Sequence, residues 1–338
     1  MAIKFDKILI VQYNLLGDVI CSTGIVRAVR EQFPSSKIAF LVSPETKDLV
    51  NIPFVDELVI YDKGMPILPV IKQIWRYDVA LLLDFKYRSA FLPFLAMIPV
   101  RAGLRHKRGL FMTHGIELPD YNYKYYITEY MAKILEDAIG LKLTADVTRL
   151  TVADATQADI SAVNNLLSPI AGDKKFVAVA PFASNPVKNW SAERYYEFMT
   201  KLSDEYNFVI IGGKDDADKP FKVPENALDL RGKASMTESA EILRRASYLV
   251  CGCSAPLHLA VAVRTPILAL YGSTSKIKWV PKKGAVCIQH NFSCSPCDRW
   301  YGRDCGNKAP CMKSITVDEV VEGFYELVKL YPNGVIEE

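Results

Sequence analysis

The chain has 338 residues, of which 50% are hydrophobic and 23% are charged, and its net charge is +3. This composition is typical of a globular protein with about two domains, and so small a net charge gives no indication of nucleic-acid binding. The longest apolar run, 91–100, is too short to span a membrane and contains two prolines. The amino terminus lacks the apolar core of a signal peptide, so we expect a cytosolic protein.

The first half of the chain alternates strand and helix patterns. Strand-like apolar runs occupy 7–13, 37–42, 58–61 and 79–83, and apolar residues at helical spacing follow the first run from Val19 to Phe33. Alternation of this kind predicts a parallel sheet covered by helices.

The same pattern restarts near Lys175 and ends in an amphipathic helix. Strand patterns lie at 176–180, 208–211, 248–250 and 266–271, and helix patterns at 191–205, 237–245, 256–263 and 316–331. The two series predict an α/β protein with two Rossmann-like domains facing each other across a cleft. The expected divisions are a first domain at 1–155, a linker at 156–173, a second domain at 174–315, and a terminal helix and tail at 316–338.

In open parallel sheets, ligands bind beyond the carboxyl ends of the strands. Asp18 follows the first strand in the segment Leu16-Gly17-Asp18, where it would act either as a helix N-cap or as a catalytic carboxylate. No GxGxxG motif is present there, so the sequence does not indicate a dinucleotide cofactor.

Three strand ends of the second domain carry residues suited to binding an anion or a sugar ring. The first is followed by Ser184 and Lys188, the second by Asp215, and the third by Ser254 and Ala255 at the start of a helix that contains Leu257 and His258. Lysine and helix amides would offset phosphate charge, and a carboxylate would accept ribose hydroxyls. Alternatively, the lysine is solvated, the aspartate favours a helix start, and the histidine is a packed structural residue.

The segment Asp216-Ala217-Asp218 also spells D-x-D, a motif that binds a metal ion and a nucleotide in other enzymes. Three letters are weak support for a metal site.

Basic residues cluster in the first domain. Lys86 and Arg88 precede a run that contains Arg101, Arg105, Lys107 and Arg108. The cluster is interpreted either as a solvated basic face or as a site for an anionic, membrane-bound acceptor.

Cysteines are concentrated near the carboxyl terminus, where Cys294-x-x-Cys297 precedes Cys305 and Cys311. Four thiols with one C-x-x-C pair could hold zinc or iron, although the spacing is not that of a standard zinc finger. The alternative is free thiols packed under the last helix, because disulfides do not persist in the cytosol.

Three segments together resemble glycosyltransferase family 9, the heptosyltransferases. They are KILIVQYNLLGDVICSTGIVRAVREQFP at 7–34, PFASNPVKNWSAERYYEFMTKL at 181–202, and LDLRGKASMTESAEILRRASYLVCGCSAPLHLAVAVRTPILALYGST at 228–274. The resemblance implies a GT-B fold and inverting transfer of heptose from ADP-heptose to a lipopolysaccharide inner-core acceptor, with no required cofactor, at the cytoplasmic face of the inner membrane.

The resemblance also implies roles for individual residues. Asp18 matches the general base, Lys188 the lysine on the donor phosphates, and Asp215 the ribose contact. Ser254, Leu257 and His258 align with the diphosphate-binding turn, while the first domain would bind the lipid-linked acceptor through Lys86, Arg88, Arg101 and Arg105.

The chain departs from the family pattern in one turn, where Cys253-Ser254-Ala255 replaces Asp-Ser/Thr-Gly. The loss of this carboxylate leaves open another nucleotide-sugar donor or a sugar-nucleotide-binding module without activity, and the cysteine cluster leaves open a protein acceptor.

Overall fold

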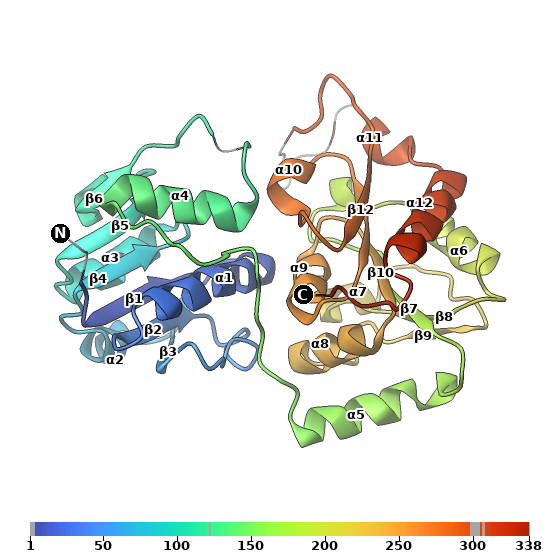
Figure 1. Ribbon diagram of the computed structural model, residues 1–338, viewed down its shortest axis with the longest axis horizontal. Helices are drawn as coiled ribbons and strands as arrows, with labels where there is room; N and C mark the ends of the chain where they lie inside the picture. The colour runs from blue at the N-terminus through green and yellow to red at the C-terminus, as the bar shows by residue number, and fades with distance from the viewer. Residues whose placement is uncertain (1–3, 122, 298–304, 306–307, 338) are drawn as a thin grey trace. The chain divides into compact units, whose positions relative to one another are not determined.

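The computed structural model describes residues 4–121, 123–297, 305 and 308–337. Contacts divide the chain into two compact units, 1–153 and 154–338, which are coloured from blue to green and from green to red in Figure 1. Each unit is a parallel sheet with helices packed around it.

The first unit contains a sheet in the order β3-β2-β1-β4-β5-β6. The strands are β1 (Lys7–Val11), β2 (Lys37–Val42), β3 (Glu57–Ile60), β4 (Val79–Leu82), β5 (Val100–Leu104) and β6 (His114–Ile116). The helical segments are α1 (Leu16–Gln32), α2 (Ile67–Gln73), α3 (Tyr87–Leu95), η1 (Gly109–Phe111) and α4 (Ile127–Ile139). Central strands β1 and β2 are buried along their length after their first lysines, as expected for strands covered on both faces.

The second unit contains a sheet in the order β12-β11-β10-β7-β8-β9. The strands are β7 (Phe176–Ala180), β8 (Asn207–Ile210), β9 (Ala227–Asp229), β10 (Tyr248–Cys251), β11 (Ile267–Tyr271) and β12 (Ala285–Gln289). The longer helices are α5 (Gln157–Leu167), α6 (Ala192–Lys201), α8 (Met236–Arg245), α9 (Ala255–Val263) and α12 (Val317–Leu330). The short helical segments are η2 (Ser168–Ile170), η3 (Pro186–Lys188), α7 (Lys214–Ala217), α10 (Lys276–Trp279) and α11 (Pro310–Lys313).

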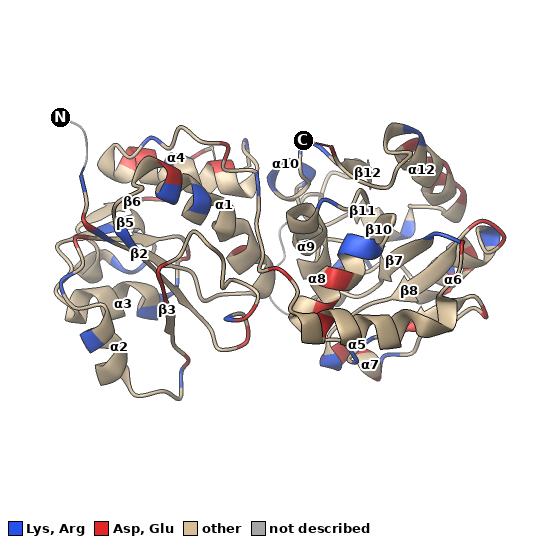
Figure 2. Ribbon diagram, turned by 60° about the horizontal axis from the view of Figure 1, so that its bottom comes forward, with Lys and Arg blue, Asp and Glu red and all other residues tan. Residues whose placement is uncertain are grey.

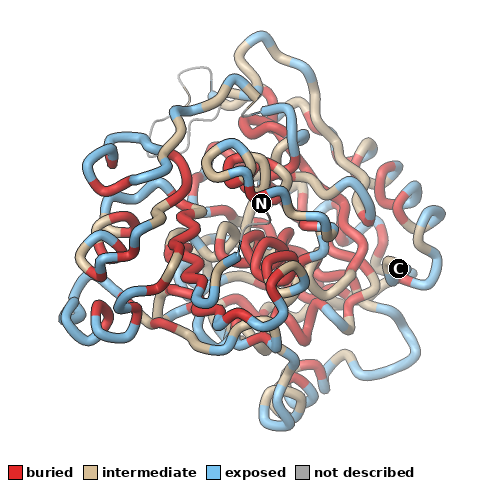
Figure 3. Tube along the Cα trace, turned by 60° about the vertical axis from the view of Figure 1, so that its left-hand side comes forward, coloured by how far each residue is buried: buried red, intermediate tan, exposed pale blue. Residues whose placement is uncertain are grey.

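Both sheets have the Rossmann strand order. In each, the chain forms a central strand first, adds two strands toward one edge, returns to the centre and then adds three strands toward the other edge. The predicted α/β class with two Rossmann-like domains is therefore confirmed. Apolar strands form the core of each unit, and Figure 3 shows buried residues on the inner segments of the trace and exposed residues on many outer turns.

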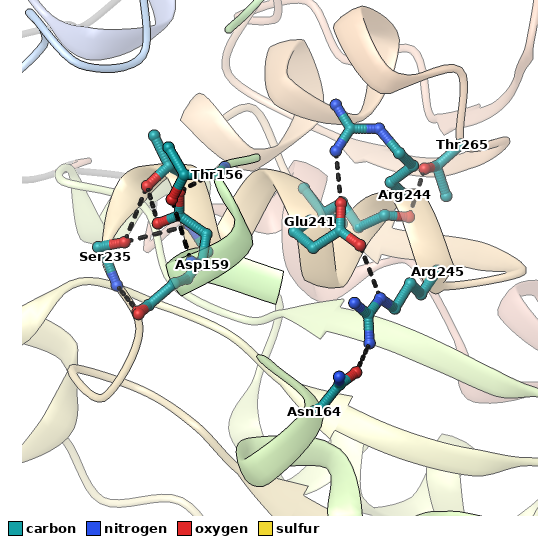
Figure 4. Close-up of polar contacts among 11 residues, drawn as sticks. Thr156, Asp159, Asn164, Ser235, Glu241, Arg244, Arg245 and Thr265 are labelled. Atoms are coloured by element: carbon teal, nitrogen blue, oxygen red, sulfur yellow. Dashed lines mark hydrogen bonds and ion pairs between the residues drawn. The ribbon is translucent and has the colours of Figure 1, made fainter. Parts of the chain in front are cut away.

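The segment 156–173, predicted as a linker, contains helix α5, which belongs to the second unit. Thr156 and Asp159 form a capping box at its start, and the Asp159 carboxylate also accepts a hydrogen bond from Thr237 of α8 over 2.8 Å. Further along, Arg245 of α8 donates to Asn164 over 2.6 Å (Figure 4). These polar contacts fix α5 against α8.

None of the helices in the described part of the chain combines the length and the apolar character that a membrane-spanning helix requires.

Candidate functional site

Each sheet has one point where consecutive crossovers leave in opposite directions, and ligands bind at such switch points. In the first unit it lies between β1 and β4, and in the second between β7 and β10. Polar side chains that follow these strands are therefore the candidates for function.

Asp18 lies in the first turn of α1, directly after β1. The N-cap residue of α1 is Leu15, which makes no side-chain capping hydrogen bond, so the interpretation of Asp18 as an N-cap is wrong. The side-chain amide of Asn14 instead donates to Asp18 Oδ2 over 3.0 Å and orients the carboxylate. The amino end of a helix stabilises negative charge, so the position suits an ionised carboxylate.

Asp84 follows β4 at the same switch point, and sequence reasoning missed it. Its carboxylate accepts hydrogen bonds from Ser89 Oγ at 2.6 Å and from the Lys86 amide at 2.9 Å, and it lies 3.5 Å from Arg108 Nη1. Both side chains of the ion pair are about 1% exposed. Burial raises the pKa of Asp84 and lowers that of Arg108, while their mutual attraction opposes both shifts. The pair therefore anchors the turn that presents Lys86.

The structure brings three of the four predicted acceptor-binding cations to the carboxyl edge of the first sheet. The Lys86 ammonium lies 5.5 Å from the centre of the Tyr13 ring, Arg88 donates to Tyr61 Oη over 2.8 Å, and Arg105 follows the end of β5. Positive charge thus lies along the carboxyl edge of this sheet, where Arg105 also lies 3.7 Å from Glu117 Oε1.

Arg101 does not join them. It is the second residue of β5 and therefore lies toward the opposite edge of a parallel sheet, and its guanidinium donates to the carbonyl oxygens of Phe111 and Ile98. The position of Arg101 near other cations along the chain does not reveal which end of the strand it occupies.

In the second unit, the turns after β7 and β10 approach closely. A Cβ atom at Gly252 would lie 3.1 Å from the Lys188 carbonyl oxygen, so this contact favours glycine. Lys188 ends η3 and is buried. Ser184 is exposed in the same turn, but the amide of neighbouring Ala183 donates to Asn189 and is not available to an anion.

Two buried hydroxyl groups at this edge have no hydrogen-bond partner in the described part of the chain. They are Ser254 Oγ at the start of α9 and Ser273 Oγ after β11. Both hydroxyls are therefore able to donate a hydrogen bond to a polar ligand at this edge of the sheet. Ala255 is the first residue of α9, whereas Leu257 is fully buried and its amide donates to Ser254, so Leu257 supports the turn from the core.

His258 is buried one turn into α9, with its ring centre 5.7 Å from that of Trp279. Burial, followed by the positive charge of Lys188, lowers the pKa of His258 to about 4. The imidazole is therefore neutral at pH 7 and can act as a hydrogen-bonding group but not as a second cation.

Asp215 is exposed in the first turn of α7, after β8. The adjacent Asp216 accepts from the Gly213 amide at 3.0 Å and from Lys219 Nζ at 2.6 Å. Because these bonds occupy the Asp216 carboxylate, the D-x-D segment stabilises the start of α7.

The cysteine segment packs beside the turn after β11. A Cβ atom at Gly272 would lie 2.9 Å from Cys311 Sγ, and the Cys297 amide donates to the Ser273 carbonyl over 2.9 Å. Cys294 and Cys297 lie near enough to Cys311 for their charges to raise the pKa of its thiol, although burial is the larger cause. All eight cysteines are free thiols, and no group of three or more His, Cys, Asp or Glu side chains in the described ranges has an arrangement that could hold a metal.

Comparison with known proteins identifies relatives over most of the chain. The sequence model described as glycosyltransferase family 9 (heptosyltransferase) matches residues 70–302. Lipooligosaccharide heptosyltransferase 2 of Haemophilus influenzae is 23% identical over 292 residues, which are 80% of this chain and 84% of the relative.

Two solved structures share the fold. A glycosyltransferase family 9 protein from Veillonella parvula has a TM-score of 0.81 at 19% identity and covers 98% of this chain and 99% of its own. E. coli ADP-heptose lps heptosyltransferase II has a TM-score of 0.75 at 21% identity, with 96% and 99% covered. The expected GT-B fold is thereby confirmed.

Proposed function

Because the chain belongs to glycosyltransferase family 9, we propose that it transfers heptose from ADP-heptose to a lipopolysaccharide inner-core acceptor with inversion. The relatives named above support heptose as the transferred sugar and, in the E. coli title, ADP-heptose as the donor. The first unit supplies the base and the acceptor site, and the second unit holds the nucleotide.

The observation that carries the proposal is the polar edge of the second sheet. Lys188 supplies one positive charge, and Ser254 Oγ and Ser273 Oγ are buried hydroxyls with hydrogen bonds still to make in the described structure. A diphosphate offers acceptors to all three groups, and the amino end of α9 adds a favourable dipole. Neutral His258 adds a hydrogen-bonding group without a second charge.

In the proposed reaction, Asp18 takes the proton of the acceptor hydroxyl as its oxygen attacks the anomeric carbon from the face opposite the leaving ADP. The bond from the anomeric carbon to the diphosphate breaks, and the electron pair leaves with ADP. General-base help of this kind is worth about 10²–10⁴-fold in rate. Lys188 and the α9 amides offset the charge that grows on the departing diphosphate.

We assign acceptor binding to Lys86, Arg88 and Arg105, whose charges suit a phosphorylated, lipid-linked core at the cytoplasmic face of the inner membrane. Arg101 is left out of this set because its guanidinium is bound to backbone carbonyls.

Transfer by this route needs no metal cofactor, since the cation for the leaving group is Lys188. A structural metal at Cys294, Cys297, Cys305 and Cys311 is a separate proposal. Three of these thiols lie near one another, but their present arrangement in the described structure is not a ligand set. Metal analysis of the purified protein tests it, and a metal-free protein with full activity would refute it.

The experiment for the donor is a panel of ADP, ADP-heptose, UDP and UDP-sugars, read as shifts in the thermal unfolding midpoint. ADP and ADP-heptose should raise the midpoint, in the presence of EDTA as well as without it. A shift with UDP compounds alone would establish another donor. Donor binding without ADP release in the presence of a core acceptor would favour a binding module or a protein acceptor.

A further inference from the structure

An outer surface of the first unit exposes an unusual amount of apolar side chain. Residues 65–69, Met-Pro-Ile-Leu-Pro, are all exposed, and Leu68 is 59% exposed. Runs of exposed consecutive apolar residues mark functional surfaces, because they lower solubility without adding to the core.

Neighbouring elements extend this surface. The Arg76 amide donates to the Ala96 carbonyl over 3.1 Å, which joins the end of α2 to the end of α3 and brings exposed Trp75 near Met97, which is 65% exposed. Phe94 of α3 packs against Phe111 of η1, with ring centres 5.2 Å apart, next to Leu110, which is 80% exposed. We call this surface the α2–α3 face, made of Met65, Ile67, Leu68, Trp75, Phe94, Met97 and Leu110.

Positive charge predominates in the sequence around the α2–α3 face. Residues 62–117 include nine lysines and arginines and four acids, of which Asp62 and Glu117 lie at the two ends of the segment. Asp84 is buried against Arg108, and Asp78 accepts hydrogen bonds from the amides of Asp6 and Lys7 at 2.7 Å. Figure 2 shows basic positions on α2 and around α3, with no acidic position on either helix.

We propose that the α2–α3 face binds the surface of an anionic phospholipid bilayer. Exposed Trp, Phe, Leu and Met would enter the headgroup region, while Lys63, Lys72 and Arg76 would contact lipid phosphates. Trp, Phe and Met are enriched at protein interfaces as well, whereas lysine is depleted there, so Lys63 and Lys72 are the residues that favour a membrane over a protein partner.

The position of α3 links this surface to the acceptor site, a step that rests on the proposed function. The helix starts beside Lys86 and ends at Leu95, so its nine residues span about 13 Å. Arg88 also donates to the Lys63 carbonyl over 3.4 Å, directly before the exposed 65–69 run. A lipid-linked acceptor held in the bilayer would therefore present its phosphorylated sugars to Lys86 and Arg88.

The test is co-sedimentation of the full chain with vesicles that contain no acceptor. One set of vesicles is phosphatidylcholine alone, and in the other about one lipid in three is phosphatidylglycerol. Wild type should bind the anionic vesicles, and 0.5 M salt (roughly a 4 Å screening length) should weaken the binding. The double variant Leu68→Ser/Trp75→Ser should bind at least about tenfold more weakly. The variant Lys72→Glu/Arg76→Glu should lose the preference for anionic lipid.

The matched control is Leu330→Ser/Val335→Ser, which removes two exposed apolar side chains from the second unit and should bind like wild type. Equal binding by wild type and Leu68→Ser/Trp75→Ser, or a concentration-dependent dimer that this variant dissociates, would overturn the inference. In the variant Leu68→Ser/Trp75→Ser, the rate of transfer to a delipidated acceptor should equal that of wild type. If wild type does not transfer heptose to this acceptor, the result counts against the proposed function and not against the membrane surface.

Discussion

Replacement of His258 by glutamine should make the free energy of unfolding of the second unit less dependent on pH at acid pH. The imidazole is buried beside Trp279, and burial with the nearby Lys188 charge lowers its pKa from 6.5 to about 4. Between these values the unfolded chain binds a proton that the folded chain does not. The free energy of unfolding therefore falls as pH falls from about 7 to about 4.

The lowered pKa corresponds to about 3 kcal/mol across that range, at 1.36 kcal/mol for each pKa unit. His258→Gln keeps a polar side chain but removes the titration, so the variant should lose most of this dependence. Urea unfolding at several pH values between 7 and 4 measures it, and His114→Gln, at an exposed position in the first unit, is the control. Equal pH dependence in His258→Gln and wild type would show that the imidazole titrates normally and refute the reasoning.

Two further substitutions test the polar groups at the switch points. Lys188→Ala should raise the Kd for ADP about 10–100-fold, since hydrogen bonds to charged groups contribute about 1.5–3 kcal/mol; calorimetric titration measures this, and unchanged affinity would remove Lys188 from the donor site. Asp84→Asn should destabilise the first unit by about 3–5 kcal/mol in urea unfolding, because it leaves the buried Arg108 charge uncompensated. A loss under 1 kcal/mol (about the value of a surface pair) would show that water screens the pair.

The central strands could be predicted from sequence because burial on both faces requires continuous apolar runs. The predicted bounds of β2 and β7 agree with the structure. Strands β5, β6, β9 and β12 were missed, since they lie outside the centre of their sheets and contain residues such as Arg101, Gly103 and Asp229. These strands are stabilised by pairing with neighbouring strands, and a local sequence pattern does not reveal such pairing.

Helix α5 has a local signal in the sequence at its start. Thr156 and Asp159 have the spacing of a capping box, and both side-chain contacts are present. The high content of small and polar residues led instead to the prediction of a linker.

The candidate site was predicted where a strand end carried a recognisable motif, as at Asp18 and Ser254. Asp84 has no motif around it, although its position after a buried strand follows the same rule that selected Asp18. Its pairing with Arg108, 24 positions later, depends on the fold of the intervening helix and strand. Basic residues are numerous in this region, so sequence alone does not separate buried Arg108 and backbone-bound Arg101 from the more accessible Lys86.

The proposed reaction depends most directly on the Asp18 carboxylate. The decisive measurement is the rate of heptose transfer from ADP-heptose by Asp18→Asn, with exposed Asp48→Asn as the control for loss of one carboxylate from the same unit. We predict a kcat about 10²–10⁴-fold below wild type, with ADP affinity unchanged. Transfer by Asp18→Asn at the wild-type rate would contradict the assignment of the base and the mechanism built on it.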